Sequence, residues 1–402
     1  MVPTPPVTDL AAPPRDDTAA HWMNLRRVTV YPRIFVAIYL ITSIIWVWLA
    51  VDLTDPKGKP LGYDFITFWS ASWLALAGEA AAAFDAARIF AIQRIAVPAS
   101  DAVFLWHYPP TFHLVVLPLA LMPYFAAYGA WIAATFAGYA WVIRRFAPTQ
   151  VTTWLLLAFP GTFINAFHGQ NGFLTTALFG GAILSLQTTP VLSGILFGLL
   201  SFKPQLGLLI PLALACGRRW TAFVVATATS LAFAAISALV LGAESWLAFW
   251  NNFPLVRTVL DSGEVPWAKI PSFYIFLRTL GVPAEPAYGL HAILAVAVAA
   301  FVARAWWRGT SPILAAAVLT SGAVLVPPYL FDYDLALLAI PIAIIAWDAV
   351  RRGWLPWERE VLLAAWLLPL VGPGFTEATG VPVATPCLIA LMTVAVRRAA
   401  QR

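Results

Sequence analysis

An acidic residue lies among aromatic residues shortly after the first long apolar segment of this sequence. That segment runs from residue 34 to 52, and the stretch beyond it is Gly62-Tyr63-Asp64-Phe65-Ile66-Thr67-Phe68-Trp69. An acid just outside a membrane face, beside a surface of rings, suits a general base that deprotonates a sugar hydroxyl. The alternative is structural, because Asp64 could instead cap a helix that starts at Phe65.

Further polar residues stand where other apolar segments end. Tyr108-Pro109-Pro110, flanked by His107 and His113, makes a rigid entry to a helix, which structure alone can explain. In His168-Gly169-Gln170-Asn171 the needs of a tight turn account for Gly169 and Asn171 but not for Gln170. An amide at that position could bind sugar hydroxyls, so we treat Tyr108, His168, Gln170 and Asn171 as candidate substrate contacts.

Lys203 lies between two apolar segments, in Ser201-Phe202-Lys203-Pro204-Gln205. A lysine at the end of a membrane span often extends along the apolar surface to keep its charge in water. Here we expect it to extend toward the outer face. A point cation at that surface is what a lipid-linked phosphate requires, which makes Lys203 the candidate donor-phosphate contact.

Two more groups complete the candidates. Asp332 and Asp334 lie among aromatic residues in Pro327-Pro328-Tyr329-Leu330-Phe331-Asp332-Tyr333-Asp334, where helix capping is again the alternative. Lys269 and Tyr274 could line a donor or acceptor groove, although the aromatic residues around them also suit anchoring at the membrane interface. The spacing of His, Cys and carboxylates predicts no metal site.

The composition places these residues in a membrane protein. Hydrophobic residues make up 61% of the 402 residues and charged residues 11%, and the mean hydropathy is +0.80. These values are typical of a polytopic membrane protein, and no polar block is long enough for a separate soluble domain. The net charge of +5 therefore indicates orientation rather than nucleic-acid binding. The two cysteines are too few for a disulfide framework.

The pattern predicts an all-α protein with about 12 transmembrane helices, in which residues 26–402 form one membrane domain after a disordered tail at 1–25. Outer loops are expected at 53–108 and 243–285, with interfacial helices within 65–97. In the run 111–143, Pro118 and Pro123 indicate a half-helix followed by one full span, although two further crossings remain an alternative there. The predicted spans are 34–52, 125–145, 151–168, 171–187, 190–202, 204–217, 220–242, 286–303, 312–327, 335–350, 360–373 and 382–396.

The arginine pairs orient this threading. With every pair placed in the cytoplasm, both termini lie inside, and 16 of the 24 Lys and Arg residues face inward. All the candidate site residues then fall on the outer, extracytoplasmic side.

The order of motifs resembles glycosyltransferase family 87, within the GT-C superfamily of integral-membrane glycosyltransferases. The resemblance covers about residues 30–350 and rests on these motifs in order: Asp64-Phe65-x-x-Phe68-Trp69, Tyr108-Pro109-Pro110, Gly169-Gln170-Asn171, Lys203-Pro204-Gln205 and Tyr329-Leu330-Phe331-Asp332-Tyr333-Asp334. It implies transfer of mannose or arabinofuranose from a polyprenyl-phosphate donor to a cell-envelope glycan or glycolipid, with inversion and on the outer face of the inner membrane. It implies Asp64 as general base and Lys203 as the donor-phosphate contact. Because a polyprenyl phosphate is already a reasonable leaving group, no cofactor is expected and a divalent metal is optional.

Two other functions remain open from the residues. A transporter or lipid flippase would favour ionisable groups near the middle of spans and internal repeats, and neither is evident. A non-catalytic membrane subunit would use the outer acids as helix caps. The sequence does not give the sugar, the acceptor or the oligomeric state.

Overall fold

The computed structural model describes residues 21–309 and 311–401, and its regular elements there are helices, with two isolated β-bridges within residues 51–60. The all-α prediction is confirmed for these residues. Most of the predicted tail at 1–25 lies outside the described residues. The α-helices are α1 (Leu25–Trp48), α2 (Phe65–Leu76), α3 (Ala86–Ala96), α4 (Pro110–Val116), α5 (Tyr124–Phe146), α6 (Gln150–Ala158), α7 (Pro160–His168), α8 (Gly172–Ser185), α9 (Pro190–Leu199), α10 (Pro204–Gly207), α11 (Ile210–Cys216), α12 (Trp220–Leu241), α13 (Ala243–Ser262), α14 (Phe273–Thr279), α15 (Ala284–Trp307), α16 (Pro312–Ala323), α17 (Ala339–Arg352), α18 (Glu358–Thr379) and α19 (Ala384–Ala400). The 3₁₀ helices are η1 (Ala80–Phe84), η2 (Leu119–Leu121), η3 (Leu200–Phe202), η4 (Trp267–Lys269) and η5 (Asp332–Leu338).

Six helical stretches are long and apolar enough to cross a membrane, in agreement with a multi-pass protein. Each corresponds to one of the predicted spans. They are α1, α5, α12, α15, the continuous stretch Asp332–Arg352 made of η5 and α17, and α18.

The other six predicted spans are shorter or interrupted. Residues 171–187, 190–202, 204–217 and 312–327 form apolar helices of 10–17 residues, below the roughly 20 that a bilayer crossing needs. The segment 151–168 breaks between α6 and α7 at Pro160. The last, 382–396, is α19, a helix of 17 residues. Helix length therefore supports six of the predicted crossings, which number about 12.

Proline sets many of these helix boundaries. The helices α4, α7, α9, α10 and α16 each carry a proline in the first turn, where its missing N–H has no intrahelical partner to lose. The run 111–143 follows this rule and forms the short α4, then η2, then α5, as the sequence predicted. The second predicted loop, 243–285, contains α13 and α14 and is mostly helical.

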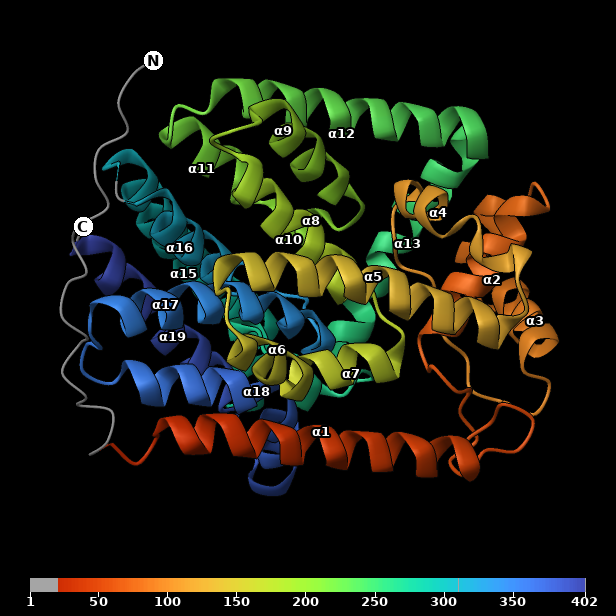
Figure 1. Ribbon diagram of the computed structural model, residues 1–402. Helices are drawn as coiled ribbons and strands as arrows, with labels where there is room; N and C mark the ends of the chain where they lie inside the picture. The colour runs from red at the N-terminus through yellow and green to blue at the C-terminus, as the bar shows by residue number, and fades with distance from the viewer. Residues whose placement is uncertain (1–20, 310, 402) are drawn as a thin grey trace, which may run out of the picture.

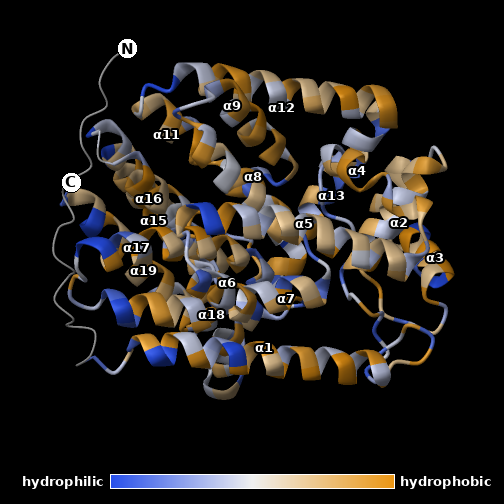
Figure 2. Cartoon of the chain, viewed as in Figure 1, coloured by the Kyte–Doolittle hydropathy of each residue, from blue (hydrophilic) through white to orange (hydrophobic). Residues whose placement is uncertain are grey.

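Three long helices show how the chain is arranged. In Figure 1, α1, α5 and α12 run roughly parallel, and α1 begins, α5 ends and α12 begins at the same end of the molecule. The pairs Arg26-Arg27, Arg144-Arg145 and Arg218-Arg219 belong to these helix ends. Figure 2 shows that the hydrophilic residues of α1 gather near its first turns. The opposite end of the molecule carries α2 and α3.

The first predicted outer loop holds two helices, but one of them is not amphipathic. Nine of the 12 residues of α2 are buried, on every side of the helix. The Trp69 indole N–H donates to the Met122 carbonyl at 3.0 Å, and the Ser72 hydroxyl donates to that of Leu117 at 2.7 Å. The expectation that α2 is amphipathic is therefore wrong: protein surrounds the helix, and these two bonds hold it against the turn around η2.

Candidate active site

Asp64 faces His168, although 104 residues separate them in the chain. The Asp64 Oδ2 and His168 Nδ1 atoms lie 3.1 Å apart, and the two side chains are 26% and 16% exposed. A carboxylate oxygen can accept a hydrogen bond from Nδ1 when the imidazole ring carries a hydrogen there. Asp64 occupies the N-cap position of α2, but its side chain makes no capping hydrogen bond. Capping therefore does not account for this acid.

Gly169 allows the turn after α7 to pack against the start of α2. It ends α7 in the left-handed conformation, with φ +62°, which glycine adopts without a steric penalty. A Cβ at this position would lie 2.4 Å from the Cβ of Phe65, closer than atoms can pack. The Trp131 indole N–H donates to the Gly169 carbonyl at 3.1 Å. The turn after α7 is thus fixed against the start of α2, and this contact brings His168 to Asp64.

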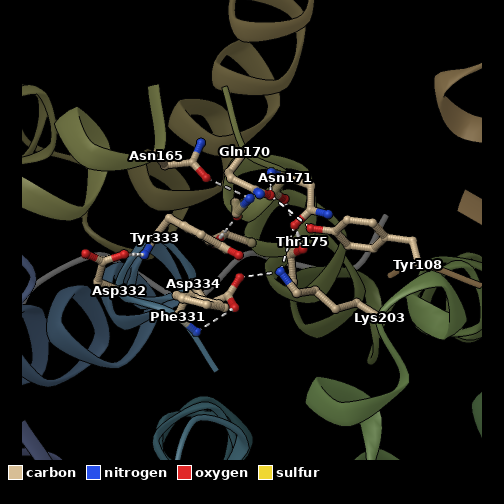
Figure 3. A network of polar contacts seen from close by, with 12 residues as sticks. Tyr108, Asn165, Gln170, Asn171, Thr175, Lys203, Phe331, Asp332, Tyr333 and Asp334 are labelled. Atoms are coloured by element: carbon tan, nitrogen blue, oxygen red, sulfur yellow. Dashed lines mark hydrogen bonds and ion pairs between the residues drawn. The ribbon is translucent and has the colours of Figure 1, made fainter. Parts of the chain in front are cut away.

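A second polar cluster lies deeper and includes Lys203. The Lys203 ammonium forms an ion pair with Asp334 and donates to the Asn171 Oδ1 at 2.8 Å (Figure 3). Lys203 is 3% exposed and Asp334 4%. The expectation that Lys203 extends outward into water is wrong, because a buried ammonium must be paired and here Asp334 supplies the opposite charge. The second Asp334 oxygen accepts from the Phe331 N–H at 3.3 Å, so capping does explain part of this acid's role.

An aromatic core positions this buried lysine. Phe202, next to it in the chain, stacks on Phe112 with ring centroids 4.9 Å apart. Phe112 also lies edge-on to Phe68 at 5.0 Å, and Phe68 to Tyr108 at 5.6 Å. Such pairs contribute about 0.5–1.5 kcal/mol each beyond burial. Aromatic residues of three predicted motifs, together with Phe112 of α4, therefore pack the motifs against one another.

Tyr108, Gln170 and Asn165 form a chain of hydrogen bonds beside Asn171. The Tyr108 hydroxyl donates to the Gln170 Oε1 at 3.0 Å, and the Gly172 N–H donates to the Asn165 Oδ1 at 2.8 Å. Burial is the main cause that raises the pKa of Tyr108 well above its usual value, and the charges of Asp334 and Asp64 raise it further. The hydroxyl is therefore a proton donor at any physiological pH. Asn165 is a site residue that the sequence analysis missed, and a polar residue inside an apolar helix was its signal.

Tyr333 connects the two clusters and was also missed as a site residue. Its ring centroid lies 6.1 Å from that of His168 and 5.6 Å from the Lys203 nitrogen. The signal was present, since Tyr333 stands between two candidate acids. Asp332 is buried, and its Oδ1 accepts from the N–H of Tyr333 at 2.9 Å.

The two candidates from the second outer segment differ in position. Lys269 is partly exposed and lies within electrostatic reach of Asp332. Tyr274 lies instead in a separate apolar cluster with Ile275 and Leu260, and its hydroxyl donates to Asp261. The structure therefore brings Lys269 to the site and leaves Tyr274 outside the polar network.

The site therefore contains the partly exposed carboxylate of Asp64, which contacts the His168 imidazole. Beside it lie the buried ion pair of Lys203 with Asp334 and several buried amide side chains. A carboxylate held this way can accept a proton from a hydroxyl group, which is general-base chemistry. Within residues 21–309 and 311–401, no three His, Cys, Asp or Glu side chains are grouped to hold a metal ion.

The chain matches Glycosyltransferase family 87 over residues 106–328, which is more than half of its 402 residues. The matched range includes Tyr108, the turn at 168–172, Lys203 and Lys269. It begins after Asp64 and ends before Asp332. Neither the curated proteins nor the solved structures contain a match to the chain.

Proposed function

We propose a reaction for this chain, which belongs to glycosyltransferase family 87. It transfers a mannose-like or arabinofuranose-like sugar from a polyprenyl-phosphate donor to an extracytoplasmic glycan or glycolipid. Membership makes it a membrane glycosyltransferase, which sets aside the transporter, flippase and non-catalytic alternatives. The observation that carries the proposal is the uncapped, partly exposed Asp64 carboxylate held against His168 at 3.1 Å.

The proposed reaction is a single displacement with inversion. The acceptor oxygen forms a bond to the anomeric carbon while the bond from that carbon to the phosphate oxygen breaks. Asp64 takes the acceptor proton, and the electron pair leaves with the polyprenyl phosphate. His168 holds one carboxylate oxygen from Nδ1, which leaves the other free for the hydroxyl. A base of this kind contributes roughly 10²–10⁴ in rate.

Lys269 is better placed than Lys203 to meet the donor phosphate. The Lys203 ammonium is already bound to Asp334 and Asn171, so a phosphate would have to displace a buried carboxylate. Lys269 is partly exposed, lies near Asp332, and makes no ion pair within 4 Å among the residues that the structure describes. We therefore assign the phosphate contact to Lys269, and to Lys203 the support of the pocket wall.

The remaining candidates shape the sugar pocket in this proposal. Gln170, Asn171 and Asp334 are buried and orient one another, while Tyr108 and Asp332 lie at the edge of the same network. Tyr274 supports the outer helical cluster rather than the sugar. The site faces the extracytoplasmic side of the inner membrane, with both termini in the cytoplasm. The chain makes about 12 crossings in a GT-C-like arrangement.

The substitution Asp64→Asn tests the base. It keeps the shape and an oxygen that accepts from His168, but it abolishes proton acceptance. Transfer of labelled sugar should fall about 10²–10⁴-fold in membranes from a strain that lacks the native enzyme, at unchanged protein level and donor binding.

Asp85→Asn is the matched control. Asp85 is a true helix cap in the same outer segment, because its carboxylate accepts from the N–H groups of Ala87 and Arg88 at 2.9 Å. Asparagine caps about as well as aspartate, so this variant should keep normal transfer. Normal transfer by Asp64→Asn as well would remove Asp64 from the mechanism.

A further inference from the structure

The turn that leads into Asp64 is strained at Tyr63. This residue has φ +43°, a left-handed conformation that a bulky side chain rarely adopts and that surrounding contacts must stabilise. Asp52 and Leu53, in the same segment, have φ +49° and +61°. Asp64 directly follows this unusual backbone geometry. Its position is therefore fixed by the contacts that stabilise the turn.

Asp55 holds the strained turn together. The Tyr63 hydroxyl donates to the Asp55 Oδ2 at 2.6 Å. The other oxygen accepts from the N–H groups of Lys57 and Lys59, both at 2.9 Å. Asp55 is 6% exposed. Its burial opposes ionisation, but the Tyr63 hydroxyl and the N–H groups of Lys59 and Lys57 outweigh this and lower its pKa below the usual value. Asp55 is therefore ionised although it is buried, and these hydrogen bonds stabilise its negative charge.

The Tyr63 ring carries this constraint to the active site. Its centroid lies 5.2 Å from that of His168 and 5.2 Å from that of Phe167. On another side, Trp46 of α1 lies 5.9 Å away with its plane 20° from that of Tyr63. The ring thus forms a wall beside the imidazole that contacts Asp64.

We propose that Asp55 is a positioning residue, which fixes the Tyr63 ring through the hydroxyl and thereby holds His168 and Asp64 in the geometry needed for proton transfer. The inference rests on the proposed function, because it assigns Asp55 and Tyr63 to the support of the proposed base. Neither touches the reacting atoms.

Tyr63→Phe tests the tether, because it removes one oxygen and keeps the ring. A catalytic group displaced by about 1 Å can cost about 10²-fold in rate, so a loosened wall should lower kcat about 10-fold. The KM values for donor and acceptor should stay within twofold. Asp55→Asn should lower kcat similarly, and the double variant should be no slower than Tyr63→Phe alone, because both changes break the same link.

Tyr288→Phe is the matched control. Tyr288 also donates to a carboxylate of an outer segment, Asp261, at 3.1 Å, and it should keep normal kcat. If Tyr63→Phe has normal kcat, or if the two losses multiply in the double variant, the tether has no role in positioning. If instead Asp64→Asn retains transfer, the proposed base is wrong, and that result is separate from the outcome at Tyr63.

Discussion

Lys203→Met should unfold the protein more readily rather than weaken donor binding. The substitution keeps the apolar stem but leaves Asp334 as a buried charge without its cation, at 4% exposure. Of its contacts, the hydrogen bond from Phe331 N–H would remain. Breaking a buried ion pair by removing one partner costs about 3–5 kcal/mol. Unfolding in mixed micelles by titration with SDS measures this loss as a shift in midpoint.

The double substitution Lys203→Met/Asp334→Asn is the control for charge. It removes both charges, and the asparagine oxygen still accepts from Phe331 N–H. Replacing a whole buried pair with neutral groups is often nearly neutral in stability, so the double variant should recover most of the loss. A Lys203→Met protein with normal unfolding and a raised KM for the donor would refute this reasoning. That result would make Lys203 the phosphate contact.

Three further outcomes are expected. Lys269→Met should raise the KM for the polyprenyl-phosphate donor about tenfold at normal expression, because a charge-assisted contact of about 1.5 kcal/mol is lost. An unchanged KM would show that Lys269 does not contact the donor phosphate. Gly169→Ala should abolish transfer, because its Cβ would overlap Phe65, whereas Gly58→Ala, at φ +76° in open space, should keep it. Burial lowers the pKa of His107 from 6.5 to about 4, so the unfolded chain binds more protons between those pH values and stability falls as the pH drops through them. His107→Gln should flatten that part of the curve of unfolding midpoint against pH.

The helical segmentation could be predicted because its signals are local. A proline in the first turn of α9 or α16 reports a boundary without knowledge of the rest of the chain. Long apolar runs such as 220–242 likewise predict a span from composition alone. The burial of α2 could not be predicted this way. Its surroundings come from the turn around η2 and from α4, and an apolar helix buried by protein has the same composition as one facing lipid.

The pairing within the site could not be predicted from the same signals. Asp64 and His168 are 104 residues apart, and Lys203 and Asp334 are 131 apart. The sequence marks all four as candidates because each is a polar residue beside apolar or aromatic residues, but no spacing rule says which pairs with which. The sequence therefore suggests a phosphate contact for Lys203 but not its ion pair with Asp334. Tyr333, between the two pairs, could be recognised only once the pairs were known.

The pairing also decides which acid is free to act. Three carboxylates lie at the site, and a general base must come within about 2.6–3.2 Å of the proton that it takes. Asp334 is 4% exposed and neutralised by Lys203, so it has neither access to substrate nor an unpaired charge. Asp332 is equally buried and accepts from the backbone of Tyr333. Asp64 has no capping bond, contacts an imidazole and is 26% exposed, which makes it the most accessible of the three carboxylates and the one that we propose as the base.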